Sequence, residues 1–493
     1  MGGCRSILLH FCTYLQRSEC RMSELPFIKL FKTVKAYYIF DVNTASIIRV
    51  DSNLYLNLEK LITGKIIFSQ IDSATLDKIN KLKSQGFLES CNVDAEIKHA
   101  AADHIEDYME NNVHQLILQV TQNCNLRCKY CVYSGTYINR VHTKKRMSIE
   151  TAKKAVDFYR KHNGNIETAI ISFYGGEPLL EVELISEIID YANKAFSGKK
   201  VRYNMTTNAT LLNDKIIRFL CENNINLTIS LDGPQSIQDN SRVFAESGKG
   251  TFDVIMKNID YIKEKYPFYM NNVSFNAVLD EKNDYQCSSN FFTYDFITSA
   301  LVGSTTLNQN SSKNAIHYTE AFDMNYRYEM FKAYLHLIGR LDKKYVSKLT
   351  ETQIAAMKEN IHKKIIAKGN RGKVYHPSGP CIAGATRLFV NVDEKFYPCE
   401  RVNESCEAFV LGDLDNGFNI SKINDLVNIG KLTADNCRTC WAGDFCNLCA
   451  AGMEDGNSLS SQKRLERCER MKLSCELQLK EYCTLREHGY HFS

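Results

Sequence analysis

Hydrophobic and polar residues alternate along the middle of the chain in a pattern that predicts short strands separated by longer helices. Five runs rich in β-branched residues are typical of buried strands, and they fall at residues 116–120, 169–174, 201–205, 225–231 and 273–279. Apolar residues recur at helical spacing between these runs, at residues 149–162, 182–195, 215–223 and 252–266. Because strands and helices alternate, we expect an α/β fold built on a parallel sheet.

A different pattern precedes residue 110. Two β-rich segments within residues 36–50 flank a turn at Asn43 and Thr44, which predicts a hairpin. Helical patterns follow at residues 54–61 and 74–85, and Phe87 with Leu88 favours a short strand. A strand pair followed by helices predicts a small winged-helix-like module, which we delimit as residues 22–110.

Residues 1–21 differ from the ordinary globular sequence that begins at Met22. They weakly resemble a myristoylation pattern and, at residues 6–15, the apolar part of a signal peptide. Cys12 interrupts the apolar run, and no small-residue cleavage site is evident. We therefore expect a disordered extension, or a stretch upstream of the true start.

Charge and hydropathy argue against two classes of partner. The 61 basic and 57 acidic residues leave a net charge of +4, which is too small to indicate a large nucleic-acid-binding face on 493 residues. No apolar run reaches about 18 residues, so no membrane-spanning helix is predicted. Cysteine is enriched to 19 residues, and clustered Cys-x-x-Cys pairs in a long chain point to metal rather than disulfides. We expect a protein of the reducing cytoplasm, with no nucleic-acid or membrane partner.

Polar motifs follow four successive predicted strands, each at its carboxyl end. In chain order they are Cys124; Gly175, Gly176 and Glu177; Asn208; and Ser230 with Asp232. In parallel α/β folds the carboxyl ends of the strands meet at one edge, where chemistry gathers. Four polar motifs at four strand ends therefore predict one functional site.

The first of these motifs is a C-x3-C-x2-C run formed by Cys124, Cys128 and Cys131. Three thiolates at that spacing can hold three irons of a four-iron cluster, whereas a fully ligated cluster needs four cysteines. The fourth iron would then be open, which is typical of chemistry rather than scaffolding. The alternative is zinc, which needs four ligands, and the nearest histidines are His114 and His142.

With the aromatic Tyr130 before its third cysteine, this run resembles the cluster loop of the radical S-adenosylmethionine (SAM) superfamily. The resemblance implies that the open iron chelates the amine and carboxylate of SAM. One electron from the cluster would then cleave SAM to a 5′-deoxyadenosyl radical, which abstracts hydrogen. It also implies a partial (β/α)6 TIM-like barrel, which we assign to residues 111–300.

The same resemblance implies which residues bind SAM. Gly175, Gly176 and Glu177 resemble the motif that meets its amino group, because glycines permit close approach and a carboxylate can accept from an ammonium. Tyr130 belongs to the same predicted site.

Three further residues, Asn208, Ser230 and Asp232, are similarly placed to bond the sugar or carboxylate of SAM. The alternative for each is helix capping or turn formation. Arg242 matches a family arginine often preceded by His-Asp, but Gln238 stands in place of the histidine. A surface salt bridge is the alternative role for Arg242.

Beyond a helical bridging region at residues 301–376, residues 377–493 resemble the SPASM domain, which holds two auxiliary four-iron clusters in radical SAM peptide maturases. The resemblance rests on seven cysteines, which are Cys381, Cys399, Cys437, Cys440, Cys446, Cys449 and Cys468. Two features depart from the family pattern. Glu394 stands where glycine is usual, and the gap from Cys446 to Cys449 is one residue shorter than usual.

Carried over position by position, the resemblance divides these cysteines between two clusters. Cys437, Cys440, Cys446 and Cys468 would hold one cluster completely, and Cys381, Cys399 and Cys449 would hold the other. The second cluster would take Cys406 as its fourth ligand or keep an open iron that could bind a substrate thiolate. A zinc ribbon is the alternative for residues 437–449.

Together these parts resemble radical SAM/SPASM maturases of ribosomally synthesised peptides, closest to the sactipeptide maturases, including the ruminococcin C type, of bacteriocin biosynthesis. The resemblance implies a Cys-rich precursor peptide whose leader adds a strand to the N-terminal sheet. The product would be a thioether (sactionine) bridge from a cysteine sulfur to an α-carbon. It further implies three [4Fe-4S] clusters, a flavodoxin- or ferredoxin-type electron donor and an anaerobic bacterial host.

Other readings stay open at the level of sequence. The chain could form β- or γ-carbon thioethers or a carbon–carbon crosslink, or make formylglycine on a sulfatase. A non-catalytic iron–sulfur or zinc protein is a further alternative, which the strand-end motifs disfavour. No catalytic general base is identifiable from the residues.

Overall fold

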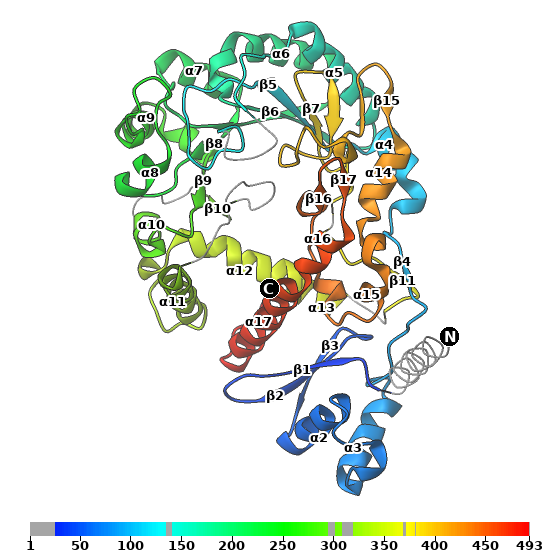
Figure 1. The fold of residues 1–493 in the computed structure, drawn as a ribbon. Helices are drawn as coiled ribbons and strands as arrows, with labels where there is room; N and C mark the ends of the chain where they lie inside the picture. The colour runs from blue at the N-terminus through cyan, green and yellow to red at the C-terminus, as the bar shows by residue number, and fades with distance from the viewer. Residues whose placement is uncertain are drawn as a thin grey trace, which may run out of the picture.

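The computed structural model describes residues 25–134, 141–293, 301–307, 319–367, 371–379 and 381–492. The expected extension at residues 1–21 lies outside the described residues. Figure 1 shows a curved central sheet with helices on its outer face, a cysteine-rich part beside it and an N-terminal module at the far end. No helix in the described part of the chain is long and apolar enough to cross a membrane.

A ten-stranded sheet forms the centre, in the order β10-β9-β8-β7-β6-β5-β12-β13-β14-β15. Its first six strands are parallel and follow one another in chain order. These strands are β5 (Gln115–Thr121), β6 (Thr168–Gly175), β7 (Lys200–Thr207), β8 (Asn226–Ser230), β9 (Val273–Leu279) and β10 (Val302–Thr306). The predicted α/β fold is confirmed, and six parallel strands are what a partial (β/α)6 barrel requires.

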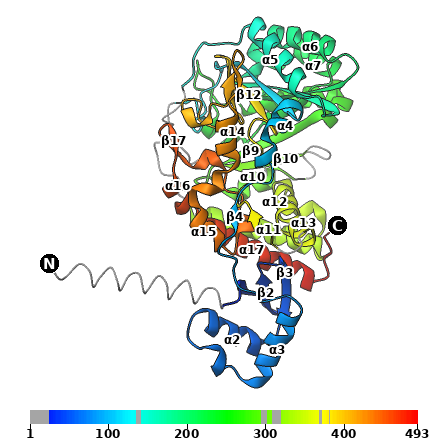
Figure 2. The same cartoon turned by 90° about the vertical axis from the view of Figure 1, so that its right-hand side faces the viewer.

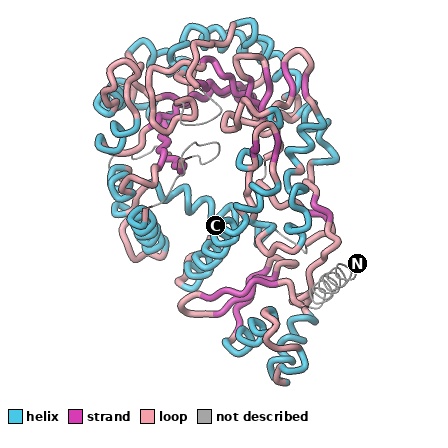
Figure 3. Tube along the Cα trace, in the orientation of Figure 1, coloured by secondary structure: helices cyan, strands magenta, loops and turns pink. Residues whose placement is uncertain are grey.

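Helices cover the outer face of these strands (Figures 1 and 3). They are α5 (Ile149–His162), α6 (Val182–Ala195), α7 (Asp214–Glu222), α8 (Gln235–Ser241), α9 (Phe252–Lys265) and α10 (Tyr285–Phe291). The predictions at residues 149–162 and 182–195 are confirmed to the residue. Ser148 caps α5 by accepting from the amide of Thr151, and the apolar side of this helix is buried in the core shared with the strands.

The sixth strand was not predicted. β10 lies where the sequence reads as a polar stretch, and our boundary at residue 300 cuts it off from the barrel. Val302 is its one buried hydrophobic residue, so the apolar pattern of a core strand is missing. Parallel backbone pairing with β9, from Val302 opposite Phe275 to Thr306 opposite Leu279, holds the strand instead.

The N-terminal module is a three-stranded antiparallel sheet followed by helices. Its elements are β1 (Ile28–Lys32), β2 (Tyr37–Asp41), β3 (Ser46–Val50), α2 (Ser52–Ile62) and α3 (Ser73–Ser84). The predicted hairpin and both helices are confirmed, and β1 is additional. The strand expected at Phe87 and Leu88 is wrong, because Leu88 has a φ of 60° and donates its amide to Asp41 Oδ2 at 2.7 Å instead of entering a ladder.

The cysteine-rich part continues the barrel sheet, because β12 pairs in parallel with β5, with Leu388 opposite Leu116. Its elements, with those that lead into it, are β4 (Glu96–Ile97), α4 (Ile105–Asn111), α11 (Glu320–Leu337), α12 (Glu351–Met357), α13 (Lys363–Ala367), β11 (Val374–Tyr375), β12 (Leu388–Val390), β13 (Lys395–Tyr397), β14 (Gly412–Asp413), β15 (Gly417–Phe418), α14 (Ile420–Val427), α15 (Ala434–Arg438), β16 (Glu454–Asp455), β17 (Ser458–Leu459), α16 (Ser461–Glu466) and α17 (Cys468–Glu487). The predicted barrel and the predicted SPASM region are therefore joined by backbone hydrogen bonds.

The N-terminal sheet packs against this cysteine-rich part, as the side view in Figure 2 shows. Phe40 of β2 lies 5.1 Å from the ring of Phe445, in a core cluster that also includes Leu479 of α17. Lys29 forms an ion pair with Glu476 at 2.6 Å. The module is thus fixed to the C-terminal helix through both apolar and charged contacts.

Candidate functional site

The loop after β5 carries the three cysteines of the C-x3-C-x2-C run. The amide of Leu126 donates to Cys124 Sγ at 3.4 Å, and the amide of Cys131 donates to the carbonyl of Cys128 at 3.1 Å. Burial raises the pKa of Cys124 to about 12 and that of Cys128 to about 11. These thiols are shielded from water on a tightly turned loop, which is a suitable donor set for a soft metal centre.

Two glycines let the end of β6 close onto this loop. A Cβ on Gly175, whose φ is +149°, would lie 2.1 Å from the carbonyl oxygen of Thr121, and one on Gly176 would lie 2.0 Å from that of Asn123. The amide of Gly176 donates to Thr121 O at 2.8 Å, and the amide of Glu177 donates to Asn123 O at 2.9 Å. The Gly-Gly-Glu segment therefore fixes the start of the cysteine loop through its backbone.

Glu177 is buried, and the chain itself surrounds its carboxylate. Oε1 accepts from Thr207 Oγ1 at 2.6 Å and from the amide of Leu179 at 3.0 Å, while Oε2 accepts from the amide of Asn208 at 2.8 Å. Burial raises the pKa of this carboxyl, and these hydrogen bonds oppose the rise. The side chain thus ties the end of β6 to the end of β7.

Asn208 extends this connection to the cysteine loop. Its Nδ2 donates to Asn125 Oδ1 at 2.9 Å and lies 3.9 Å from Cys124 Sγ. Ser230 ends β8, half-buried beside Asn276 of β9. The structure thus brings the predicted site residues of β6 and β7 against the cysteine loop.

A buried ion pair joins β8 to the same loop. Arg242 donates from Nε and Nη2 to the two carboxylate oxygens of Asp232, at 3.0 and 3.2 Å, and Tyr130 donates its hydroxyl to Asp232. Arg242 also lies 5.3 Å from the centre of the Tyr130 ring. The alternative of a surface salt bridge for Arg242 is wrong, because the two charged side chains are only 8% and 1% exposed.

Gln238, which stands where the family pattern has histidine, was not predicted to take part. It is fully buried, and its Oε1 accepts from the amide of Asp232 at 2.9 Å. Its Nε2 donates to Thr251 Oγ1 at 3.1 Å. An amide thus holds the Asp232 backbone in place.

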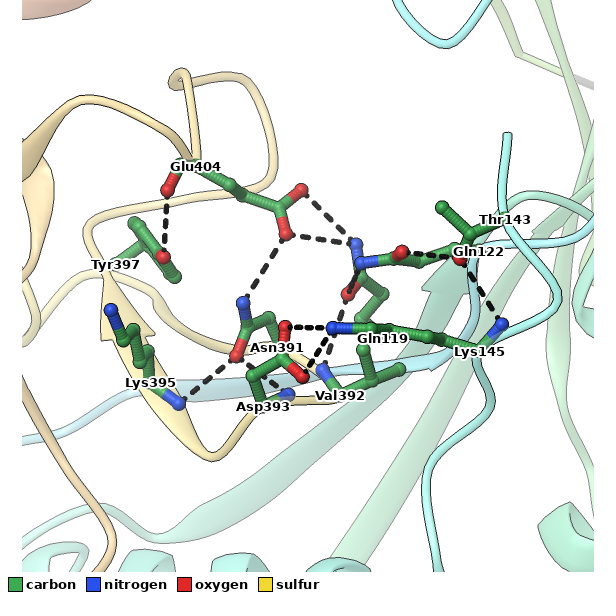
Figure 4. Close-up of polar contacts among 10 residues, drawn as sticks. All are labelled: Gln119, Gln122, Thr143, Lys145, Asn391, Val392, Asp393, Lys395, Tyr397 and Glu404. Atoms are coloured by element: carbon green, nitrogen blue, oxygen red, sulfur yellow. Dashed lines mark hydrogen bonds and ion pairs between the residues drawn. The ribbon is translucent and has the colours of Figure 1, made fainter. Parts of the chain in front are cut away.

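A second group that sequence reasoning missed joins β5 to the turn between β12 and β13 (Figure 4). Gln119 of β5 donates to Glu404 at 3.0 Å and to the hydroxyl of Tyr133 at 3.0 Å. Tyr133 and Asn391 also donate to Glu404, at 3.1 and 3.4 Å. The polar Gln119 inside an apolar strand was the one available signal, but its partner lies 285 residues away.

Cys381, Cys399 and Cys449 lie near enough to one another for their charges to interact. Burial raises the pKa of Cys399 to about 12, and the neighbouring Glu400, Cys449 and Cys381 add to the rise. Cys381 and Cys449 are solvent-exposed. Cys406 instead lies buried in the apolar core, and burial raises its pKa with contributions from Glu454 and Glu407.

The other predicted group surrounds a cavity of about 420 Å³. All four of its cysteines line that cavity, and they are Cys437, Cys440, Cys446 and Cys468. No group of three or more His, Cys, Asp or Glu side chains in the described ranges is arranged to hold a single metal ion. A four-iron cluster needs wider spacing, because each thiolate binds a different iron, and four cysteines around one cavity fit that requirement.

The sequence model of the radical SAM superfamily matches residues 118–284, the part of the chain that carries the cysteine loop and the polar strand ends. This part of the chain is therefore a radical SAM domain. One relative is MJ0907 from Methanocaldococcus jannaschii, 33% identical over 201 residues that cover 36% of this chain and 67% of that protein.

Two further relatives carry descriptions of their chemistry. The radical SAM cyclopropyl synthase TigE from Paramaledivibacter caminithermalis is 25% identical over 291 residues, which cover 52% of this chain and 57% of TigE. A cysteine-type anaerobic sulfatase-maturating enzyme from Clostridium novyi is 35% identical over 147 residues, which cover 29% of this chain and 38% of that enzyme. The match thus spans only about half or less of these two relatives.

The structure of native anSMEcpe with bound AdoMet has the same fold. It aligns with a TM-score of 0.54 at 18% identity, covering 74% of this chain and 99% of that one.

Proposed function

We propose that this protein is a radical SAM maturase that forms thioether bridges between cysteine sulfurs and α-carbons of a Cys-rich, ribosomally synthesised precursor peptide. The observation that carries the proposal is the gathering of the distal cysteines into two separate groups. The exposure of Cys381 and Cys449 supports the thioether reading, because a substrate sulfur could reach an iron held there. The proposed setting is the cytoplasm of an anaerobic bacterium.

Cys124, Cys128 and Cys131 would hold the cluster that, when bound with SAM, supplies the hydrogen-abstracting radical. Tyr130, Asp232 and Arg242 would position that loop, and Ser230 and Asn208 would bond the cofactor. Gly175, Gly176 and Glu177 would act mainly through their backbone and by fixing neighbouring strands, since the carboxylate is already engaged within the chain.

The inner face of the barrel suits a peptide substrate. Ile171 and Phe173 of β6 face the helices, so Ser172 between them faces inward. It accepts from Gln115 at 2.6 Å and from Asn204 at 3.2 Å, and Asn226 donates to Asn204 at 2.9 Å. Hydrogen-bonded polar side chains therefore line this part of the inner face.

The N-terminal sheet would bind the leader of the precursor. β1 and β3 are the edges of that sheet, and β1 lies against α17. In the described residues β3 has no strand on its outer side, so an extended leader could add there. A flavodoxin- or ferredoxin-type protein is the proposed electron donor.

The relatives support a peptide substrate and also a second candidate function. The sulfatase-maturating enzyme of Clostridium novyi, 35% identical over 147 residues, supports formylglycine formation on a sulfatase as the second candidate. A structure of anSMEcpe holds both AdoMet and the Kp18Cys peptide. The leader module argues for the precursor-peptide reading.

Anaerobic reconstitution with iron, sulfide, dithionite and SAM tests both readings. We expect formation of 5′-deoxyadenosine, and a loss of two hydrogens per bridge in a Cys-rich peptide encoded beside the gene. The variant with Cys124, Cys128 and Cys131 replaced by alanine is the matched control. An unchanged precursor mass would contradict the thioether proposal, and conversion of a sulfatase peptide would establish the second candidate. Absence of 5′-deoxyadenosine would refute both.

A further inference from the structure

Arg464 of α16 is buried beside the four-cysteine cavity. Its side chain is only 1% exposed, whereas arginine is almost never fully buried without partners. Nε donates to Thr433 Oγ1 at 3.0 Å, and Nη2 donates to the carbonyl of Pro377. Nη1 is buried and has no hydrogen-bond partner among the described residues. Arg464 also lines the cavity, so this cationic side chain lies at the wall of the predicted cluster site.

A second contact connects the same arginine to a cysteine of the cavity. Thr433 Oγ1 lies 3.3 Å from Cys437 Sγ. A ligating thiolate has no proton and can only accept, so the threonine hydroxyl must donate to it. Arg464 Nε donates to the oxygen of the Thr433 hydroxyl. The hydroxyl proton is therefore still available for a hydrogen bond to the sulfur. The arrangement is therefore a relay from guanidinium to hydroxyl to sulfur.

Arg464 brings a positive charge to the wall of this cavity, and its side chain is almost fully shielded from water. The same charge acts on a bound cluster, whose negative charge grows by one on reduction. Hydrogen bonds to the sulfurs and nearby positive charge favour the reduced form.

We propose that Arg464, directly through Nη1 and indirectly through Thr433, raises the reduction potential of the auxiliary cluster held by Cys437, Cys440, Cys446 and Cys468. The inference rests on the proposed assignment of these cysteines to a cluster. Beside the other group, the carboxylate of Glu400 pairs with Arg387 at 3.0 Å. We therefore expect Arg464 to shift the potential of its own cluster only.

Redox titration followed by electron paramagnetic resonance tests this proposal without reference to turnover. The titration uses the full chain with Cys124, Cys128 and Cys131 replaced by alanine, so that only auxiliary clusters contribute. We expect Arg464→Gln to shift one midpoint potential to more negative values and to leave the other unchanged. Thr433→Val produces a smaller shift in the same cluster, and Thr433→Ser restores the potential.

Lys463→Gln is the matched control, because it removes one positive charge from the exposed side of the same helix. Unchanged midpoints in Arg464→Gln with full iron content would overturn the proposal. If that variant loses iron, Thr433→Val decides, and an unchanged midpoint there overturns the proposal equally. The parent protein is expected to hold about eight irons per chain. An iron content near zero would refute the assignment of these cysteines to clusters. That result is different from unchanged midpoint potentials in Arg464→Gln.

Discussion

At the scale of single residues, the close approach at Gly176 sets a strict limit on side-chain size. We expect Gly176→Ala to push the end of β6 away from the cysteine loop, because its Cβ would lie 2.0 Å from the carbonyl of Asn123. Iron retention by the loop and 5′-deoxyadenosine formation should fall together by at least about tenfold, the equivalent of about 1.4 kcal/mol. Gly372→Ala is the control, since its Cβ meets its nearest atom at 3.5 Å. Equal losses in both variants would contradict the prediction.

The buried pair of Asp232 and Arg242 makes a second residue-scale prediction. Arg242→Gln leaves a buried carboxylate without its cation, which costs about 3–5 kcal/mol. The midpoint of chemical denaturation should fall accordingly. Adding Asp232→Asn should recover part of the loss, because the double variant buries no unpaired charge. A double variant less stable than Arg242→Gln would argue against an electrostatic origin.

At the scale of elements, Glu404 connects the cysteine loop to the turn between β12 and β13. Glu404 accepts hydrogen bonds from Gln119, Tyr133 and Asn391. In Glu404→Gln one of its two oxygens is replaced by a donor NH2 group, and the lost hydrogen bonding costs about 1–3 kcal/mol of local stability. Hydrogen exchange should quicken in residues 119–134 and 391–404. Glu407→Gln, which removes only an exposed pair with Lys422, should leave both segments unchanged. Faster exchange limited to residue 404 itself would refute the connection.

The junction of β11 with residues 428–431 predicts a pH dependence. His376 Nε2 accepts from the amide of Gly430 at 2.9 Å, and burial, reinforced by the charges of His99 and Arg464, lowers the pKa of His376 to about 4. Between pH 6.5 and 4 the unfolded chain binds a proton that the folded chain does not, so stability falls as the pH falls through this window. Thermal melting at pH 7 and pH 5 should show a larger loss in the wild type than in His376→Gln. Equal losses of melting temperature in the wild type and His376→Gln would show that other groups cause the pH dependence.

At the scale of the whole molecule, the N-terminal sheet and α17 share one core. Phe40→Ala leaves a cavity against Phe445 and should cost about 3–5 kcal/mol. Limited proteolysis should then release the N-terminal module while the barrel stays intact. Phe268→Ala is the control, because that ring is 89% exposed. Cleavage of the barrel before the module would contradict a role confined to this interface.

Local pattern was sufficient for much of the fold. The helices at residues 149–162 and 182–195 each form an apolar face within fourteen residues, Ser148 caps the first of them, and both were predicted to the residue. The strand ends were equally clear, because turn formers follow β-branched runs. β10 could not be predicted, since its polar sequence acquires strand structure only from pairing with β9.

The sequence by itself determined the cysteine spacing, the strand–helix alternation and the placement of polar motifs at strand ends, because each depends on residues close together in the chain. Only the tertiary structure decided that Glu177 bonds Thr207, that Gln119 meets Glu404 and that Arg464 lies beside four cysteines. The first two of those contacts join residues 30 and 285 positions apart. Their partners are selected by burial and backbone geometry, which no local pattern of residues specifies.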